Sequence, residues 1–246
     1  MSSRSVIVAA LLALAVPFAA LAADGAAKAP ELKKGDNIIF LGDSITDGGR
    51  APKGYCTLVQ KGVEAKMPDA GITFVNAGVS GNKVPDVQGR LQKDVLDKKP
   101  TLVFIYIGIN DVWHWKKAAD GTMTGGTPKD KYEAGLKEVI GKIKDAGARV
   151  ILCTPSVIGE KAPGTNERDK MLDEYSDISR AVAKETGVPL VDLHKAFQDY
   201  ERANNKDDKD RGVLTTDSCH LNDAGNQLVA DQMLAALGIA PAAEKK

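Results

Sequence analysis

The sequence predicts a single α/β domain, built on a parallel sheet of about five strands with helices on both faces. Short, continuously apolar segments recur along the chain, and continuous apolarity is typical of strands that helices cover on both sides. Between these segments lie stretches in which apolar residues recur every three or four positions, which is the helical period. Regular alternation of the two patterns favours parallel strands joined by helical crossovers.

The five expected strands are residues 38–41, 72–75, 102–107, 150–153 and 190–193. Apolar stripes predict helices over residues 55–63, 132–143 and 171–182. A last helix is expected between Asn222, a good N-cap, and Leu237. Gly147 and Gly187 follow two of these helices, where a left-handed C-cap favours glycine.

Polar segments with glycine and proline separate these elements. Residues 159–168 are expected to form a loop, and residues 204–211 form a charged surface loop. Residues 116–131 are expected to form a longer, glycine-bearing loop that could act as a lid.

Composition excludes several classes of protein. The 246 residues are enough to bury a core without crosslinks, and the 43% hydrophobic and 27% charged content is that of a soluble globular protein. The 33 Lys and Arg residues balance 33 Asp and Glu residues, which argues against nucleic acid as a partner. Three cysteines can form at most one disulfide, and Cys153, at a strand end, is expected to be buried.

The amino-terminal segment is predicted to be a secretory signal peptide over residues 1–22. Arg4 precedes an almost wholly apolar run over residues 6–20, and small residues follow at positions 20–22. A membrane anchor is the alternative, but the run is shorter than the ~20 residues of a span and contains Pro17. We therefore expect an exported protein, periplasmic or secreted, without stable membrane insertion.

The remaining boundaries follow from composition. Residues 23–34 are expected to form a linker rich in Ala, Lys and Pro, and residues 35–240 the folded domain. Residues 241–246 form a carboxyl-terminal tail.

Four segments with chemically useful residues are expected at one edge of the sheet. Three follow predicted strands directly: Gly-Asp-Ser-Ile-Thr-Asp-Gly at 42–48, Asn-Ala-Gly-Val-Ser-Gly-Asn at 76–82, and Gly-Ile-Asn-Asp at 108–111. The fourth, Asp-Ser-Cys-His at 217–220, precedes the last helix. Ligands of open parallel sheets bind at the carboxyl ends of the strands, where these segments meet.

These segments contain the parts of a serine hydrolase. Ser44 needs a base to become a nucleophile, and His220 suits that role because imidazole titrates near neutral pH. Asp217, three residues before His220, would fix the imidazole tautomer. An oxyanion would be stabilised by the backbone N–H groups of Ser44 and Gly81 and by the carboxamide of Asn110.

On these residues the chain resembles the SGNH or GDSL hydrolases, the lipase/acylhydrolases of the GDSL type. Their four blocks occur here in order, at 42–48, 76–81, 108–111 and 217–220, and the resemblance extends from about residue 37 to residue 237. It implies a three-layer α/β/α sandwich of flavodoxin type and hydrolysis of carboxylic esters without metal or cofactor. No catalytic position departs from the family pattern.

The family roles, carried over, give Ser44 as nucleophile, Asp217 and His220 as acid and base, and Gly81 and Asn110 as oxyanion donors. Known members hydrolyse acetylated sugars, lysophospholipids, aryl esters and thioesters. Export and the two tryptophans near the site favour short acyl groups, such as acetyl, on carbohydrate. A lysophospholipase or arylesterase, or an acyltransferase with the same triad, are the alternatives.

Aromatic residues directly follow the Asn110 segment and provide a possible substrate wall. Trp113, His114 and Trp115 could present ring faces to a sugar or an acyl chain, or they could pack against the neighbouring helix. His194, after the fifth strand, is predicted to have a surface or capping role. Cys219 is a poor nucleophile candidate because adjacent side chains in a loop, here Cys219 and His220, seldom face each other.

Two other classes fit the sequence less well. A metal-dependent phosphoesterase using Asp43, Asn110, Asp111 and His220 would be expected to cluster more histidines and carboxylates. A nucleotide-binding module is disfavoured because the 42–48 loop has no phosphate-binding motif and no basic residue. The chain also lacks the Gly-x-Ser-x-Gly motif of ordinary α/β-hydrolases.

Overall fold

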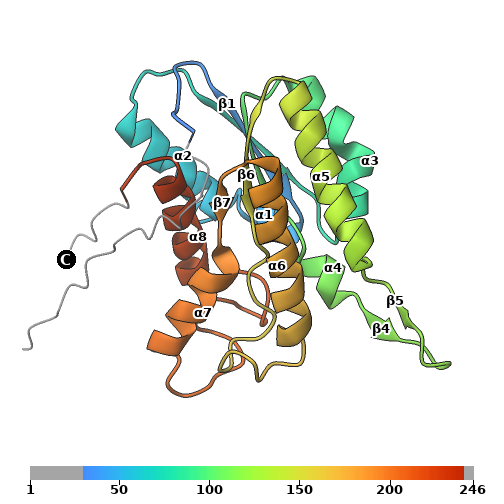
Figure 1. The fold of residues 1–246 in the computed structure, drawn as a ribbon. Coiled ribbons are helices and arrows are strands. Elements are labelled where there is room, and N and C mark those ends of the chain that lie inside the picture. Colours follow the sequence, from blue (N-terminus) through green and yellow to red (C-terminus); the bar gives the residue numbers. More distant parts are fainter. Residues whose placement is uncertain (1–29, 241–246) are drawn as a thin grey trace, which may run out of the picture.

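The computed structural model describes residues 30–240 (Figure 1). The predicted signal peptide, the linker up to residue 29 and the tail at 241–246 lie outside the described residues, so those assignments stay predictions. The boundary of the catalytic domain at residues 35 and 240 likewise stays a prediction.

A five-stranded parallel sheet forms the centre of the fold, as predicted. Its strand order is β2-β1-β3-β6-β7, which is the flavodoxin-like order, with the first strand in sequence lying second in the sheet. Gly42 at the end of β1 pairs with Gly78 and with Tyr106, so these strands end at the same level. The strands are β1 (Asn37–Gly42), β2 (Thr73–Gly78), β3 (Leu102–Tyr106), β6 (Arg149–Cys153) and β7 (Leu190–Val191).

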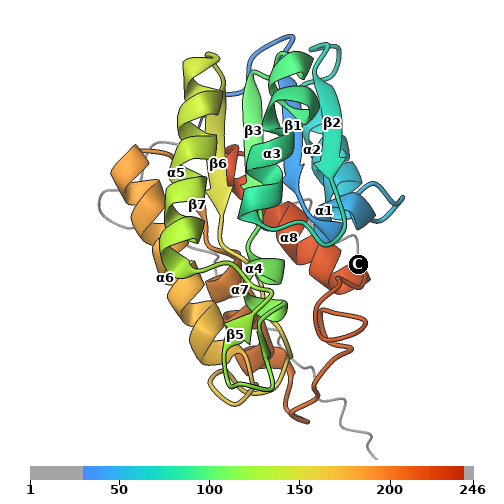
Figure 2. The ribbon, with the colours of Figure 1, turned by 90° about the vertical axis from the view of Figure 1, so that its right-hand side faces the viewer.

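Helices cover both faces of this sheet and make three layers (Figures 1 and 2). One layer contains α3 (Val84–Asp94), α5 (Lys129–Asp145) and α6 (Asp169–Thr186). The other contains α2 (Tyr55–Lys66) and α8 (Asp223–Ala236), which pack on each other, and α7 (Leu193–Asn204) contacts α8. The α/β/α sandwich expected from the sequence is therefore confirmed.

The core joins the layers through aromatic side chains. The ring of Phe40 on β1 stacks on Phe104 of β3 at 5.5 Å between centroids and on Phe74 of β2 at 6.5 Å. Tyr55 on α2 and Tyr132 on α5 are fully buried on the predicted helical stripes. This packing holds the central strands in a fixed register, and hence their carboxyl ends as well.

The predicted helix ends are confirmed where a cap was expected. Gly187 ends α6 with a φ of 68°. The side chain of Asn222 accepts a hydrogen bond from the N–H of Gly225 at 3.0 Å and begins α8. The fifth strand is shorter than predicted, because it ends at Val191 and Leu193 already begins α7.

Short elements lie below the strand ends, where loops were expected. The predicted loop at 116–131 instead contains a small antiparallel hairpin, which projects from the lower part of the molecule in Figure 1, and the start of α5. The four short elements at this edge are α1 (Ser44–Gly48), α4 (Ile109–Trp113), β4 (Lys116–Lys117) and β5 (Met123–Thr124), and a 3-10 turn (Leu96–Lys98) follows α3.

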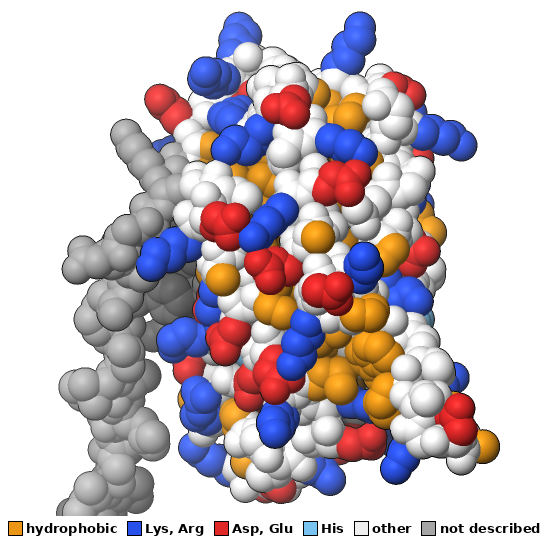
Figure 3. Space-filling view, turned by 45° about the vertical axis from the view of Figure 1, so that its right-hand side comes forward, with side chains coloured by type: hydrophobic (Ala, Val, Ile, Leu, Met, Phe, Trp, Pro, Cys, Tyr) orange, Lys and Arg blue, Asp and Glu red, His pale blue; other side chains and the backbone are white. Residues whose placement is uncertain are grey.

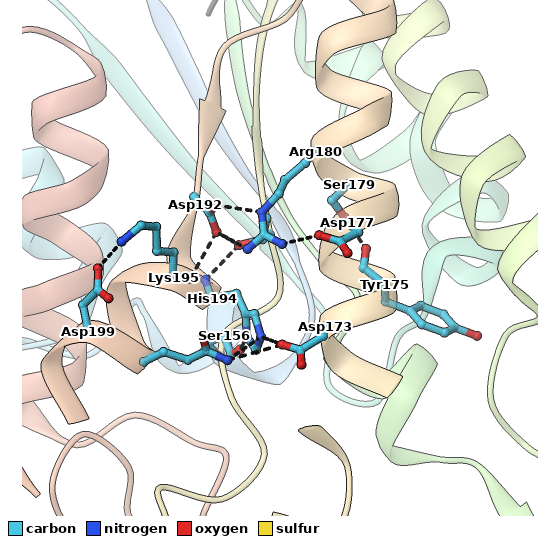
Figure 4. Close-up of polar contacts among 12 residues, drawn as sticks. Ser156, Asp173, Tyr175, Asp177, Ser179, Arg180, Asp192, His194, Lys195 and Asp199 are labelled. Atoms are coloured by element: carbon cyan, nitrogen blue, oxygen red, sulfur yellow. Dashed lines mark hydrogen bonds and ion pairs between the residues drawn. The ribbon is translucent and has the colours of Figure 1, made fainter. Parts of the chain in front are cut away.

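The surface role predicted for His194 is wrong. Its side chain is buried in the first turn of α7, where Nδ1 donates to the carbonyl oxygen of Ser156 at 2.6 Å. Nε2 lies 2.7 Å from a carboxylate oxygen of Asp173 on α6 (Figure 4). Nearby, the Arg180 guanidinium donates twice to Asp192, so this network ties α6 to the start of α7.

Within residues 30–240, no helix is both long and apolar enough to span a bilayer. Lys and Arg are interspersed with Asp and Glu over the face shown in Figure 3, with hydrophobic side chains gathered beside the β4–β5 hairpin. The cysteines within residues 30–240 are all free and buried, and the burial predicted for Cys153 is confirmed.

The strand end at Gly42 leaves no room for a side chain. A Cβ there would lie 2.4 Å from the carbonyl oxygen of Tyr106 and 2.0 Å from the hydroxyl of Thr46. We expect Gly42→Ala to lower the free energy of unfolding by about 3 kcal/mol, because backbone in the central sheet cannot move away.

Gly89 provides the matched control. It lies exposed in the middle of α3, where a Cβ would have nothing within 4 Å. Gly89→Ala should raise the free energy of unfolding by about 0.5–1 kcal/mol. Urea unfolding of both variants measures this difference, and equal stabilities would contradict the packing described.

Candidate active site

Ser44, His220 and Asp217 are in direct hydrogen-bond contact. The Ser44 hydroxyl oxygen lies 2.9 Å from Nε2 of His220, and Nδ1 of His220 lies 2.8 Å from Oδ2 of Asp217. Because a carboxylate only accepts, Nδ1 carries the hydrogen and Nε2 is left free to accept from the serine hydroxyl. The structure thus brings together three residues that the sequence separates by up to 176 positions.

Ser44 is held by the tight connection between β1 and α1. It is the first residue of α1, and the Asp43 carboxylate caps this helix by accepting from the N–H of Ile45 at 2.9 Å. Gly78 packs directly against this turn, where a Cβ would lie 2.2 Å from the backbone nitrogen of Asp47. The serine is therefore presented from a sharp, closely packed corner.

The segment that carries Asp217 and His220 has no helix or strand of its own, and a buried carboxylate organises it. Glu160 is fully buried and accepts hydrogen bonds from the backbone N–H groups of residues 213, 214 and 215, two of them at 2.7 and 2.6 Å. The N–H of Gly159 donates to the carbonyl of Ser218 at 2.7 Å. Together these bonds fix the segment with Asp217 and His220 to the segment that follows β6.

The side chain of Asp217 also stabilises the turn in which it lies. Its Oδ1 accepts from the N–H of His220 at 2.8 Å and from that of Cys219 at 3.2 Å. Partial burial alone would raise the pKa of Asp217, but the hydrogen bonds from His220 outweigh it and hold the pKa below the usual value. The carboxyl group therefore remains ionised beside the imidazole.

The predicted oxyanion donors lie on two neighbouring segments that contact each other. Gly81 has a φ of 79°, a conformation that favours glycine, and its N–H has no acceptor among the described residues. Asn110 is almost completely buried in the first turn of α4 and donates through Nδ2 to the carbonyl of Asn82 at 3.1 Å. The N–H of Ser44, at the first position of α1, is likewise without an acceptor in this part of the chain.

Arg90 on α3 connects these segments through hydrogen bonds, a role that the sequence did not predict. Its guanidinium donates to the carbonyl of Gly42 at 2.7 Å, to that of Ala77 at 2.9 Å and to the side chain of Asn82 at 2.5 Å. It thereby links the end of β1, the end of β2 and the Gly81 loop. A lone arginine in a helix carries no sequence signal for such a role.

Two buried carboxyl groups lie beneath the site. Burial raises the pKa of Asp43 to about 7, and the nearby charge of Asp111 adds to this shift. Burial raises the pKa of Asp111 to about 6, even though Asp111 accepts from the N–H of Val84 at 3.1 Å. The Asp43 carboxyl group caps α1, and that of Asp111 caps α3. Within residues 30–240, no group of three or more His, Cys, Asp or Glu side chains is placed to hold a metal ion.

Cys219 is buried rather than presented to the site. Only 1% of its surface is exposed, and burial raises its pKa above the usual value. The thiol is therefore kept in its unreactive protonated form.

The structure places the three residues of the predicted substrate wall in different surroundings. Trp113 is 37% exposed, and its ring centroid lies 6.1 Å from that of the His220 ring. Trp115 lies deeper, and its Nε1 donates to the hydroxyl of Tyr175 at 3.3 Å. Both tryptophans line a groove beside the site, whereas His114 is not part of that lining.

Known proteins resemble this chain over most of its length. A sequence model of the GDSL-like lipase/acylhydrolase family matches residues 40–228. The acetylxylan esterase of Geobacillus stearothermophilus is 33% identical over 222 residues, which is 85% of this chain and 96% of that protein. The uncharacterized lipoprotein YqeF of Bacillus subtilis (strain 168) is 28% identical over 79% of this chain and 86% of its own.

A solved structure agrees with these sequence matches. The crystal structure of an acetyl xylan esterase, AlAXEase, superimposes with a TM-score of 0.75 at 44% identity, covering 82% of this chain and 99% of its own. The fold and these relatives define the chain as a carboxylic ester hydrolase. It belongs to the GDSL-like lipase/acylhydrolase family, as the sequence motifs indicated.

Glu160→Gln should loosen the segment that carries Asp217 and His220. The variant places an NH₂ group against backbone N–H donors, so we expect the free energy of unfolding to fall by about 1–3 kcal/mol. We also expect kcat on 4-nitrophenyl acetate to fall about tenfold with little change in KM, because the misplaced group acts in the reaction step. Glu64→Gln on the exposed face of α2 is the control, and a variant with unchanged kcat would contradict the role of Glu160.

Glu201, on α7 beside Glu160, should make stability depend on pH. Burial raises its pKa to about 8, the charges of Glu160 and Asp169 add to the shift, and Oε1 has no partner among the described residues. An unfolded glutamic acid loses its proton near pH ~4.3, so the native state binds more protons than the unfolded state from there to about pH 8. Its contribution to stability is present below this range and is lost as the pH rises through it.

Glu201→Gln removes this titration. The free energy of unfolding should then fall less steeply between pH 5 and pH 8 than in the parent chain, while Asp43 and Asp111 keep a weaker slope of the same sign. Urea unfolding at intervals across this range measures the slope. A slope identical to that of the parent would show that Glu201 is already ionised in the native state.

Proposed function

We propose that this protein is an exported serine esterase that removes short acyl groups, chiefly acetyl, from carbohydrate through an acyl-enzyme. The observation that carries the proposal is the 2.9 Å contact between the Ser44 hydroxyl and Nε2 of His220, with Asp217 on the far nitrogen of the ring. A serine next to a correctly protonated imidazole has a base for its proton and can attack an ester carbonyl.

The reaction proceeds in two halves. His220 takes the Ser44 proton while the serine oxygen attacks the carbonyl, and the oxyanion that forms lies near the N–H groups of Ser44 and Gly81 and the Asn110 carboxamide. The imidazolium, stabilised by Asp217, returns the proton to the leaving alcohol oxygen. Water, deprotonated by His220, then attacks the acetyl-serine ester, and acetate leaves with regeneration of the serine.

The choice of substrate rests on the relatives and on the surroundings of His220. Two proteins that this chain resembles along most of its length are named acetylxylan esterases. The exposed Trp113 ring beside His220 provides an aromatic face of the kind that suits a sugar ring. A lysophospholipase would need a long apolar channel for its acyl chain, and this part of the chain offers mixed polar and aromatic surface instead.

Transfer of the acetyl group to a sugar hydroxyl uses the same residues and differs only in the acceptor. We favour water because Asp217 and His220 are partly exposed, so water reaches the acyl-enzyme. Export rests on the apolar segment at residues 6–20.

Ser44→Ala should lower kcat/KM on 4-nitrophenyl acetate and on acetylated xylan by about four orders of magnitude, because no nucleophile remains. The free energy of unfolding should stay within about 0.5 kcal/mol of the parent value. Ser176→Ala, which removes a buried hydroxyl without a partner among the described residues, is the matched control. Undiminished turnover by a folded Ser44→Ala protein would overturn the proposed mechanism.

A further inference from the structure

Residues 154–160 follow β6 directly and belong to no helix or strand. All of them are buried except Ile158, which is partly exposed. A buried irregular segment must find partners for its backbone N–H and C=O groups outside the ladders of a helix or a sheet. The side chains that supply those partners therefore set the position of this segment.

The helix α7 supplies partners at both ends of the segment. In its first turn, the backbone N–H of His194 donates to the hydroxyl oxygen of Thr154 at 2.9 Å. The Nδ1 atom of His194 donates to the carbonyl oxygen of Ser156 at 2.6 Å (Figure 4). At the other end of the helix, Nδ2 of Asn205 donates to the carbonyl oxygen of Glu160. The two ends of α7 thus hold the two ends of the segment.

The hydrogen bond to Ser156 does not depend on the second nitrogen of the imidazole. A carbonyl oxygen only accepts, so Nδ1 of His194 carries a hydrogen. Nε2 lies 2.7 Å from Oδ1 of Asp173 and 3.0 Å from Nε2 of Gln198. Because one of these neighbours accepts and the other donates, Nε2 has a partner with or without a hydrogen. The bond from Nδ1 is therefore the constant contact of this buried ring.

The far end of the segment holds the loop that contains His220. The Glu160 carboxylate accepts hydrogen bonds from the backbone N–H groups of residues 213–215, and the N–H of Gly159 donates to the carbonyl of Ser218. These two anchoring residues lie only three and four positions after the carbonyl that the α7 imidazole binds. Because a close-packed interior transmits displacements, a shift of that carbonyl reaches the loop.

We propose that His194 is a positioning residue for the reaction. By fixing the Ser156 carbonyl through Nδ1, it sets the segment whose Glu160 holds His220 at hydrogen-bond distance from Ser44. This inference rests on the proposed function, because it assumes that His220 takes the proton of Ser44. A displaced base slows the reaction step, whereas binding of the ester is little affected.

Two substitutions of His194 separate the contributions of its two nitrogens. In His194→Asn the amide nitrogen takes the place of Nδ1 and keeps a donor for the Ser156 carbonyl. In His194→Gln the amide nitrogen takes the place of Nε2, so the carbonyl loses its donor. We expect kcat on 4-nitrophenyl acetate to fall about tenfold in His194→Gln and to stay within about threefold of the parent value in His194→Asn, with KM little changed in both.

A general loss of stability does not produce this difference, because both substitutions remove the same buried ring. Urea unfolding identifies conditions in which each variant is folded, and kcat is measured there. Asp173→Asn, which changes the half-exposed partner of Nε2 and leaves Nδ1 in place, is the matched control. It should keep kcat within about twofold of the parent value.

A double variant shows whether His194 acts through Glu160. Glu160→Gln alone is expected to lower kcat about tenfold. When His194→Gln is added, the total loss should remain about tenfold, because both changes release the same loop, whereas independent effects would multiply to about a hundredfold.

Asn205→Asp tests the other end of the segment and decides the matter if His194→Gln does not fold. The position is partly exposed, and a carboxylate there cannot donate to the carbonyl of Glu160. We expect kcat to fall about threefold to tenfold with little change in KM. An unchanged kcat in this variant would contradict the idea that α7 positions the segment.

The outcomes separate this inference from the proposed function. Equal kcat values in His194→Gln and His194→Asn, or losses that multiply in the double variant, would overturn the positioning role while leaving the esterase intact. Absence of ester hydrolysis by the parent chain would instead overturn the proposed function. Loss of kcat in His194→Gln, its retention in His194→Asn and a double variant no slower than Glu160→Gln support the inference.

Discussion

The arrangement of the site depends on one buried carboxylate. The segment with Asp217 and His220 has neither helix nor strand to hold it, and its neighbouring N–H groups would be unsatisfied without Glu160. A fully buried charge costs desolvation energy, which three backbone donors offset by surrounding it. These hydrogen bonds hold an irregular loop as backbone pairing holds a strand. Under the proposed mechanism, a base held in this way acts without reorganisation.

The positions of the remaining site residues depend on the sheet. Three strands end at the same level, so Ser44, Gly81 and Asn110 are delivered to one edge by register alone. Arg90 then joins two of these strand ends and the Gly81 loop through a single guanidinium. Backbone pairing in the sheet therefore sets the positions of Ser44, Gly81 and Asn110. The side chain of Glu160 sets the position of the segment with Asp217 and His220.

The sequence predicted the parts of this molecule that depend on local patterns. Doubly covered strands are continuously apolar, so the sheet could be predicted directly, and the motifs at strand ends predicted which segments meet at its edge. The helices α1 and α4 have five residues each, which is too short for a period to be visible. Glu160 and Arg90 bond to backbone groups distant in the chain, and His194 turns inward from a helix start, so no residue type or spacing signals their roles.

The long separation in sequence between Ser44 and His220 determines when the site can form. A ribosome must synthesise the chain through residue 220, and the segment that carries His220 must pack against the sheet, before the Ser44 hydroxyl meets the imidazole. Shortened or nicked chains that lose this segment keep Ser44 at the end of β1 but lack the imidazole that contacts it. Under the proposed mechanism, turnover therefore reports on the integrity of the chain from β1 to the segment that carries His220.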